Sequence, residues 1–206
     1  MNWNIPNILT LLRLIAAPGV AIMFLYFHRP LADWFALILF VVAAFTDFLD
    51  GYLARAWKQE SKFGAMMDPI ADKAMVIIAL VVITGFSGMN PWILLPAVLI
   101  IFREVFVSGL REFLGETAGL LKVTNLAKWK TTVQMAAISI LFAKGAFEHY
   151  LIDRTNGDVL VLRTLELGVE ISWYLGIGLL WIAMVLTVLS GADYFGKSLP
   201  YLRDAP

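Results

Sequence analysis

Long apolar runs separated by short polar breaks dominate this chain. Runs of about 20 residues can cross the roughly 30 Å of membrane hydrocarbon at 1.5 Å rise per residue. Six runs qualify, at residues 7–27, 32–56, 64–86, 92–114, 127–147 and 169–191. The breaks carry residues typical of turns, such as His28-Arg29-Pro30. The pattern predicts an all-α, polytopic membrane protein with six transmembrane helices, joined between 148 and 168 by a connection longer than a simple outer loop needs.

The composition agrees with this class. Hydrophobic residues make up 60% of the chain and charged residues 16%, whereas an average soluble domain has about 25% charged residues. Sixteen basic and sixteen acidic residues cancel, so net charge indicates no partner, and we expect no nucleic-acid binding. The absence of cysteine excludes disulfides, thiolate metal sites and a cysteine nucleophile. No low-complexity tract divides the chain, so we expect one membrane domain over residues 1–206.

The basic residues predict an orientation. If both termini are cytoplasmic, twelve basic residues fall on or toward the inner side and only four, Arg29, Lys144, Arg154 and Arg163, fall on the outer side. Such a bias is typical of the positive-inside distribution. We therefore expect cytoplasmic N- and C-termini, a location in the inner (cytoplasmic) membrane, and a site that faces the cytoplasm.

Four aspartates interrupt the second and third apolar runs. Asp47 and Asp50 are three residues apart and share one helix face, and Asp68 and Asp72 are four apart and share another. Ionisable groups at membrane depth are costly unless they face a polar cavity and are paired or bound to a cation. One aspartate alone could be the structural partner of a neighbouring basic side chain, but four crowded carboxylates cannot all be neutralised in that way.

The four carboxylates predict a site for hard divalent cations. Two such faces turned toward each other form an all-oxygen site of the kind that Mg²⁺ and Mn²⁺ accept. Zinc is disfavoured, because the chain has no cysteine and its two histidines lie at the opposite, outer ends of their segments. We expect Asp47, Asp50 and Asp68 as the first ligands.

Small residues and one arginine accompany the aspartates. Gly51, Ala54 or Gly64 alone could simply allow two helices to approach closely. Interleaved with the aspartates, they leave room beside a metal for a bulky phosphate-bearing group. Arg55 adds a bidentate donor for a phosphate or a base edge.

Together these residues carry a resemblance to a known family. The run Asp47-x-x-Asp50-Gly51-x-x-Ala54-Arg55-x(8)-Gly64-x-x-x-Asp68-x-x-x-Asp72 matches the signature of the CDP-alcohol phosphotransferase family at every position. Other segments resemble the branch of that family that uses glycerol 3-phosphate: Asn4-Ile5-Pro6-Asn7, Thr10 to Arg13, Arg103-Glu104, Ser108 to Glu112, and Lys128 to Gln134. The likeness covers about residues 4–135, and the last apolar run matches only in hydropathy.

The resemblance implies an activity and a set of roles. It implies a cytoplasm-facing enzyme, usually a homodimer, that uses two Mg²⁺ or Mn²⁺ ions to transfer a phosphatidyl group from CDP-diacylglycerol to glycerol 3-phosphate, with release of CMP. Asp72 is the implied general base and also contacts one metal. The implied CDP-binding residues are Asn7, Thr10, Gly51, Ala54, Arg55 and Gly64.

A cationic set outside the signature indicates a phosphorylated acceptor. Arg103 and Arg111 are eight residues apart, about two turns along one helix face. Any one basic residue could equally be a positive-inside anchor, and Glu104 and Glu112 are expected to pair with neighbouring cations. The predicted ligands of the acceptor phosphate are Arg13, Arg103, Arg111, Lys128 and Lys130. On charge alone glycerol 3-phosphate and inositol phosphate both fit, and the branch motifs favour glycerol 3-phosphate.

Other functions remain open from the sequence. A member of the same family could use inositol phosphate or serine. A divalent-cation transporter also needs intramembrane carboxylates, but it predicts ligands near the midplane with access from both sides, whereas these lie toward one end of two helices. A non-catalytic lipid-binding or scaffold protein would not need Asp72 beyond three metal ligands.

Overall fold

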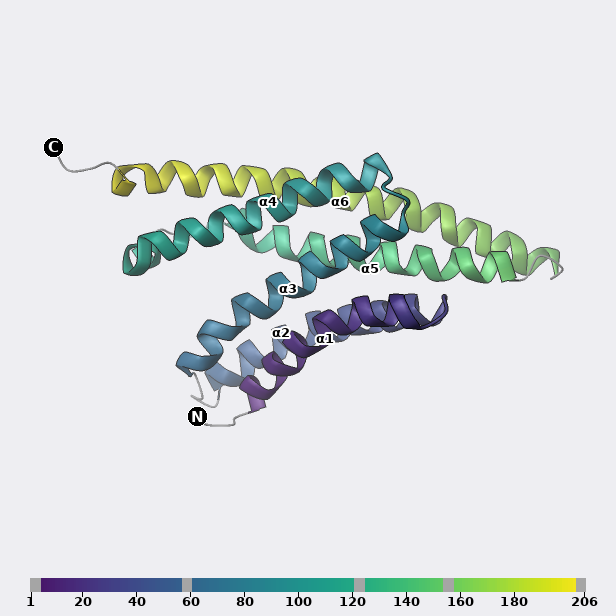
Figure 1. Ribbon diagram of the computed structural model, residues 1–206, viewed down its shortest axis with the longest axis horizontal. Coiled ribbons are helices and arrows are strands. Elements are labelled where there is room, and N and C mark those ends of the chain that lie inside the picture. The colour runs from purple at the N-terminus through teal and green to yellow at the C-terminus, as the bar shows by residue number, and fades with distance from the viewer. Residues whose placement is uncertain (1–4, 57–60, 121–124, 154–157, 203–206) are drawn as a thin grey trace.

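In a computed structural model the described residues of the chain form six α-helices and one short 3-10 helix (Figure 1). The elements are α1 (Ile5–Tyr26), α2 (Leu31–Ala56), α3 (Lys62–Phe86), α4 (Pro91–Leu114), η1 (Gly115–Leu120), α5 (Asn125–Asp153) and α6 (Val159–Leu202). The structure describes residues 5–56, 61–120, 125–153 and 158–202, without the side chains of 5–6, 47–56, 116, 120 and 125–128. No strand occurs in these ranges, so the all-α prediction is confirmed.

The helices fit a multi-pass membrane protein. Within the described ranges, five helices, α1 and α3 to α6, are long and apolar enough to cross a membrane, and the described apolar part of α2, Leu31–Thr46, is shorter. Each of the six predicted runs corresponds to one helix. Most of the exposed large side chains are apolar, for example Leu25, Val81 and Phe102, as expected where lipid tails surround the helices.

The structure differs from the sequence expectation in the last two helices. α5 continues to Asp153, and α6 begins at Val159 and runs for 44 residues. The connection expected over 148–168 is therefore largely helical. Apolar residues recur at helical spacing through its second part, so a longer helix can leave the charged residues of this stretch on its exposed face.

Two groups of helices meet at α3. α1 packs against α2 and α3, while α6 packs against α5 and α4. α3 also contacts α4 and α5, and α2 contacts α5, so α3 lies between the two groups (Figure 1). Buried apolar side chains such as Phe40, Leu80, Ile100 and Leu180 form one continuous core between them. The N-terminal end of α1 and the C-terminal end of α6 lie toward the same end of the bundle (Figure 1).

Capping residues set the start of α3 and both ends of α4. Ser61 caps α3 by accepting the N–H of Gly64 at 3.0 Å. Asn90 caps α4 by accepting the N–H of Trp92 at 3.0 Å. Gly115 has φ of +52°, a backbone conformation that favours glycine, and it ends α4. These ends fix where the polar residues of α3 and α4 lie along the bundle.

A buried ion pair fixes the opposite end of the bundle. Arg29 Nη2 donates to Asp33 Oδ1 at 2.5 Å, and the Asp33 side chain is 1% exposed. The Arg29 guanidinium also lies over the rings of Phe24 and Phe86. A Cβ at Gly145 of α5 would overlap with this pair. The pair therefore links the α1–α2 turn to α3 and α5.

Candidate active site

Polar side chains of α1 and α3 face each other near the first turns of α3. Thr10 Oγ1 donates to Asp68 Oδ1 at 2.5 Å. Arg13 Nη1 donates to Asp72 Oδ1 at 2.9 Å, and its Nη2 lies 3.8 Å from Asp68 Oδ1. The two α1 residues are three apart and the two aspartates four apart, so each pair lies on one helix face. The structure thus brings both carboxylates of the third apolar run onto the α1–α3 contact.

The signature glycine of α3 allows α1 to approach. Ser61 Oγ donates to the buried Asn7 Oδ1 at 2.8 Å and accepts the N–H of Gly64 at 3.0 Å. A Cβ on Gly64 would lie only 2.7 Å from Asn7 Oδ1, closer than side chains tolerate. Ser61 is absent from the sequence-predicted site, although a serine directly before a helical run is a recognisable cap.

Several predicted residues lie outside the described side chains. The backbone of α2 carries five of them in its C-terminal part, and Lys128 lies near the start of α5. The C-terminal end of α2 and the first turn of α3 lie at the same end of the bundle (Figure 1). The five α2 residues are Asp47, Asp50, Gly51, Ala54 and Arg55.

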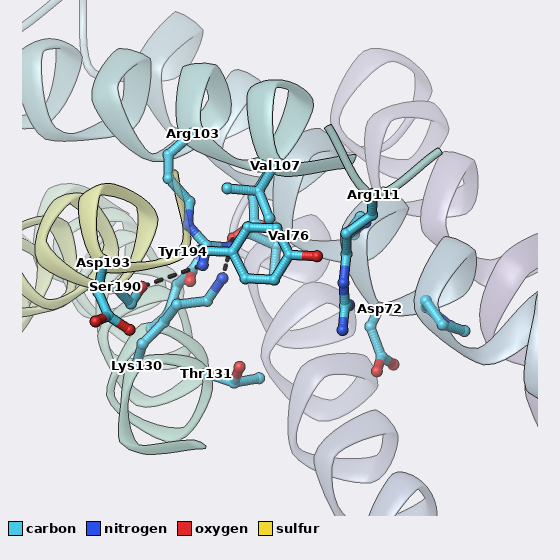
Figure 2. A pocket seen from close by; sticks show the side chains of 14 residues that line it. Asp72, Val76, Arg103, Val107, Arg111, Lys130, Thr131, Ser190, Asp193 and Tyr194 are labelled. Atoms are coloured by element: carbon cyan, nitrogen blue, oxygen red, sulfur yellow. Dashed lines mark hydrogen bonds and ion pairs between the residues drawn. The ribbon is translucent and has the colours of Figure 1, made fainter. Parts of the chain in front are cut away.

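A cavity of about 260 Å³ opens between α3, α4, α5 and α6 (Figure 2). Asp72 belongs both to this cavity and to the α1–α3 contact, so it joins the two regions. Val76 and Val107 supply apolar wall. The polar lining comes from Asp72, Lys73, Arg103, Glu104, Arg111, Lys130, Thr131, Gln134, Ser190, Asp193 and Tyr194.

Glu104 organises the cations of the cavity. Its side chain is buried and its Oε1 accepts from Lys130 Nζ, and from Arg103 Nη1 at 3.3 Å. Arg103 Nη2 also donates to Ser190 Oγ of α6 at 3.1 Å. Lys73 Nζ donates to Ser108 Oγ at 2.5 Å. Charges at such low exposure are stable only when they are paired and hydrogen-bonded.

The lining carries an excess of positive charge toward its interior. Four cationic side chains and three carboxylates line the cavity. Asp72 accepts from Arg13, and Asp193 Oδ2 accepts from Lys197 Nζ at 2.6 Å. Glu104 is then the carboxylate that balances the cavity cations. The cavity suits an anion.

Buried polar atoms of the lining also favour a polar occupant. Within the described part of the chain, Arg103 Nε, Gln134 Nε2 and Tyr194 Oη are buried without a hydrogen-bond partner. Buried polar groups in native proteins are almost always paired with protein, water or ligand. These three atoms come from α4, α5 and α6, so the unmet hydrogen bonds converge on the cavity from three sides.

The structure brings together most of the predicted acceptor ligands. Arg103, Arg111 and Lys130 line the same cavity as Asp72, whereas Arg13 lies on the α1–α3 contact, outside the cavity lining. Sequence reasoning missed the α6 side, because the last run matched the family only in hydropathy. The sequence does contain a pattern that could have indicated these α6 residues: the polar residues at 190, 193, 194 and 197 have helical spacing and follow an apolar run.

The residues at the α1–α3 contact fit a divalent cation. Asp68 and Asp72 present carboxylate oxygens one turn apart, with side chains 44% and 41% exposed, and such oxygens are the ligands that Mg²⁺ and Mn²⁺ prefer. Among the described side chains, no group of three or more potential ligands comes together. Asp47 and Asp50 are the remaining carboxylates of the predicted set.

Comparison with known proteins agrees with this geometry. The profile of the CDP-alcohol phosphatidyltransferase family matches residues 3–189. Proteins named CDP-diacylglycerol–glycerol-3-phosphate 3-phosphatidyltransferase are similar over nearly their whole length. The one from Cereibacter sphaeroides is 64% identical over 99% of both chains, that from Rickettsia bellii 40% over 95% of both, and that from Escherichia coli K12 37% over 99% of this chain and all of its own. The chain therefore belongs to the CDP-alcohol phosphatidyltransferase family, whose members generally depend on a divalent cation.

Proposed function

We propose that this protein transfers the phosphatidyl group of CDP-diacylglycerol to glycerol 3-phosphate and releases CMP. The observation that carries the proposal is the cationic cavity next to Asp72. It has space for a small anion, at about 260 Å³, whereas pockets for drug-sized ligands span about 300–1,000 Å³. The similar proteins from three organisms carry names with the same two substrates.

Asp72 is the proposed general base. It lines the cavity and also lies on the α1–α3 contact, where Arg13 holds its Oδ1 at 2.9 Å. The attacking hydroxyl of an acceptor bound in the cavity would give its proton to the Asp72 carboxylate. At the same time, the hydroxyl oxygen would attack the phosphatidyl phosphorus. The new bond joins the acceptor oxygen to the phosphatidyl phosphorus, and the bond to the CMP oxygen breaks. No covalent enzyme intermediate is needed.

The donor side of the site is proposed on the α1, α2 and α3 residues of the signature. Asn7, Thr10 and Gly64 meet at the α1–α3 contact, next to the α2 segment that carries the other signature residues. A divalent cation held there would supply Lewis-acid activation of the diphosphate and would neutralise part of its charge. We propose two Mg²⁺ or Mn²⁺ ions held by Asp47, Asp50, Asp68 and Asp72, and CDP bound by Asn7, Thr10, Gly51, Ala54, Arg55 and Gly64.

The acceptor phosphate is proposed to bind at the cationic end of the cavity, defined by Arg103, Lys130, Gln134 and Ser190. Arg103 supports this assignment through its uncommitted Nε, and Lys130 through its place on the lining. Arg111 is proposed to contact the acceptor from the other side, nearer Asp72 (Figure 2). Lys128 and Arg13 remain proposed phosphate ligands from the sequence pattern.

The cellular setting follows from the charge pattern and the resemblance. The start of α1 and the end of α6 lie toward the same end of the bundle as the start of α3 and the end of α4 (Figure 1). Together with the distribution of basic residues, this supports cytoplasmic termini and a cytoplasm-facing site in the inner membrane. Lipid surrounds the apolar faces. The family resemblance supports a homodimer and a single domain over residues 1–206.

Acceptor selectivity tests the proposal. CMP release from CDP-diacylglycerol is measured on purified protein in detergent with glycerol 3-phosphate, free glycerol, serine or inositol phosphate. We expect selective use of glycerol 3-phosphate, and reversible loss of activity in excess chelator. Preference for an unphosphorylated alcohol would contradict the phosphate site but leave the family intact. Metal uptake into vesicles without CMP release would favour the transporter.

A further inference from the structure

Tyr194 of α6 carries a hydroxyl that the proposed chemistry does not yet use. Its side chain is 7% exposed, it lines the cavity, and its Oη has no hydrogen-bond partner among the described residues. A buried tyrosine normally finds a partner for its hydroxyl. The missing partner is therefore expected in the cavity.

The ring of Tyr194 is held firmly, and only its tip is available. The ring packs in a buried cluster with Val107 and Leu114. The Arg111 guanidinium lies 5.6 Å from the ring centroid. The apolar side chains of this cluster and the Arg111 guanidinium cannot accept a hydrogen bond from Oη. The hydroxyl is thus fixed in position and left to a ligand.

Arg103 Nε and Gln134 Nε2, the other unpaired donors of the cavity lining named above, lie at a different place in the cavity. Gln134 is one turn from Lys130 on α5, so both belong to the cationic end of the cavity. Arg103 Nε belongs to the same end. Figure 2 shows Tyr194 between that end and the pair Arg111 and Asp72, with its hydroxyl pointing toward Arg111. Asp193, the other ionisable α6 group of the lining, is already paired with Lys197 at 2.6 Å.

Glycerol 3-phosphate carries its groups in the same order as this cavity. Its attacking hydroxyl, secondary hydroxyl and phosphate lie on successive carbons. With the attacking hydroxyl at Asp72 and the phosphate at the cationic end, the secondary hydroxyl falls near the middle, where Tyr194 lies. We infer that Tyr194 Oη hydrogen-bonds the secondary hydroxyl of the acceptor and selects acceptors that have one. This inference rests on the proposed function and adds a specificity residue to it.

A substrate analogue tests the inference together with one variant. 3-Hydroxypropyl phosphate keeps the phosphate and the attacking hydroxyl but lacks the secondary hydroxyl. We expect wild-type kcat/KM to be roughly three- to tenfold higher with glycerol 3-phosphate, the effect of one ordinary hydrogen bond. In Tyr194→Phe the preference should disappear, because only the reaction with glycerol 3-phosphate slows. The matched control is Tyr174→Phe, on the same helix and 74% exposed, which should keep the wild-type preference.

The alternative outcomes are distinct. Equal use of both acceptors by the wild-type enzyme would overturn the inference without any variant. The wild-type comparison therefore tests the inference even if Tyr194→Phe does not fold. An equal loss with both acceptors in Tyr194→Phe would assign Tyr194 to positioning Arg111, and would also overturn it. If the wild-type enzyme released CMP with neither acceptor, the proposed function would fail first.

Discussion

At the scale of single residues, Asp72 connects the two halves of the site. It lies on the α1–α3 contact with Arg13 and also lines the proposed acceptor cavity. A general base must reach the acceptor hydroxyl and also lie close to the donor phosphate. It must therefore border both the cavity and the α1–α3 contact. The position of this carboxylate, more than its type, supports its role as base.

Asp72→Asn is expected to slow transfer by about 10²–10⁴-fold, the usual contribution of a general base. Any greater loss reflects disturbed metal binding. CDP-diacylglycerol should still bind, which equilibrium binding in detergent measures next to the transfer rate. The control is Glu166→Gln, an exposed acid-to-amide change on α6. Near-normal turnover of Asp72→Asn would assign the base elsewhere.

Glu104 is the second residue whose surroundings define its role. It is 6% exposed and is shared by Lys130 and Arg103. Glu104→Ala should lower the free energy of unfolding by about 3–5 kcal/mol, because it leaves buried cations unpaired. Glu112→Ala, an exposed change on the same helix, should stay within about 0.5 kcal/mol. Thermal unfolding in detergent compares them, and equal effects would show that Glu104 is not the shared counter-ion.

At the scale of helices, α6 positions a side chain of α4. The Arg103 stem crosses α6 at Gly191, where an added Cβ would lie 2.8 Å from Arg103 Cγ. Glycine at 191 therefore lets the guanidinium reach both Ser190 and Glu104. The contact between these two helices is part of the proposed acceptor site.

Gly191→Ala should raise the KM for glycerol 3-phosphate about tenfold, since overpacking of about 1–3 kcal/mol displaces Arg103. Gly196→Ala is the matched control, because a Cβ there meets nothing within 4 Å, and it should leave KM unchanged. Steady-state kinetics with varied acceptor separates the two. A similar KM for both variants would argue against the crossing as a constraint on Arg103.

At the scale of the whole molecule, the site end and the Arg29–Asp33 end lie at opposite ends of the helices. Among the described residues, the cavity at the site end is lined by four cations and three carboxylates, and the smaller pocket at the other end is lined by two of each. The orientation of the bundle in the membrane decides which compartment supplies the acceptor and receives CMP. The positive-inside pattern predicts the cytoplasm.

The absence of cysteine makes this orientation testable. Lys62→Cys, at the start of α3, and Glu166→Cys, in the N-terminal part of α6, introduce one exposed thiol at each end of the bundle. A membrane-impermeant maleimide should label Glu166→Cys in intact cells and Lys62→Cys only after permeabilisation. The reverse labelling would place the site on the outer side.

The sequence alone determined the helices, and it is also the basis of the proposed donor half of the site. Long apolar runs can satisfy their backbone in a membrane only as helices, so six helices followed directly from the pattern. Local spacing also placed Asp68 and Asp72 on one face, because helix periodicity acts within a few residues. The sequence pattern did not determine where α5 ends and α6 begins, because the polar residues of this stretch suit a turn and an exposed helix face equally.

Only the tertiary structure brought together the residues of the proposed acceptor half. Ser190, Asp193 and Tyr194 line one cavity with Arg103 and Lys130, which lie 60 to 91 positions earlier in the chain. No local pattern reports which helices become neighbours. The same holds for Gly64 and Gly191, whose missing side chains matter because Asn7 and Arg103 pass beside them. Arg13, expected at the acceptor phosphate, donates to Asp72 on the α1–α3 contact. A long cationic side chain can reach several anions, and the packing of α1 on α3 determines which of them lies next to it.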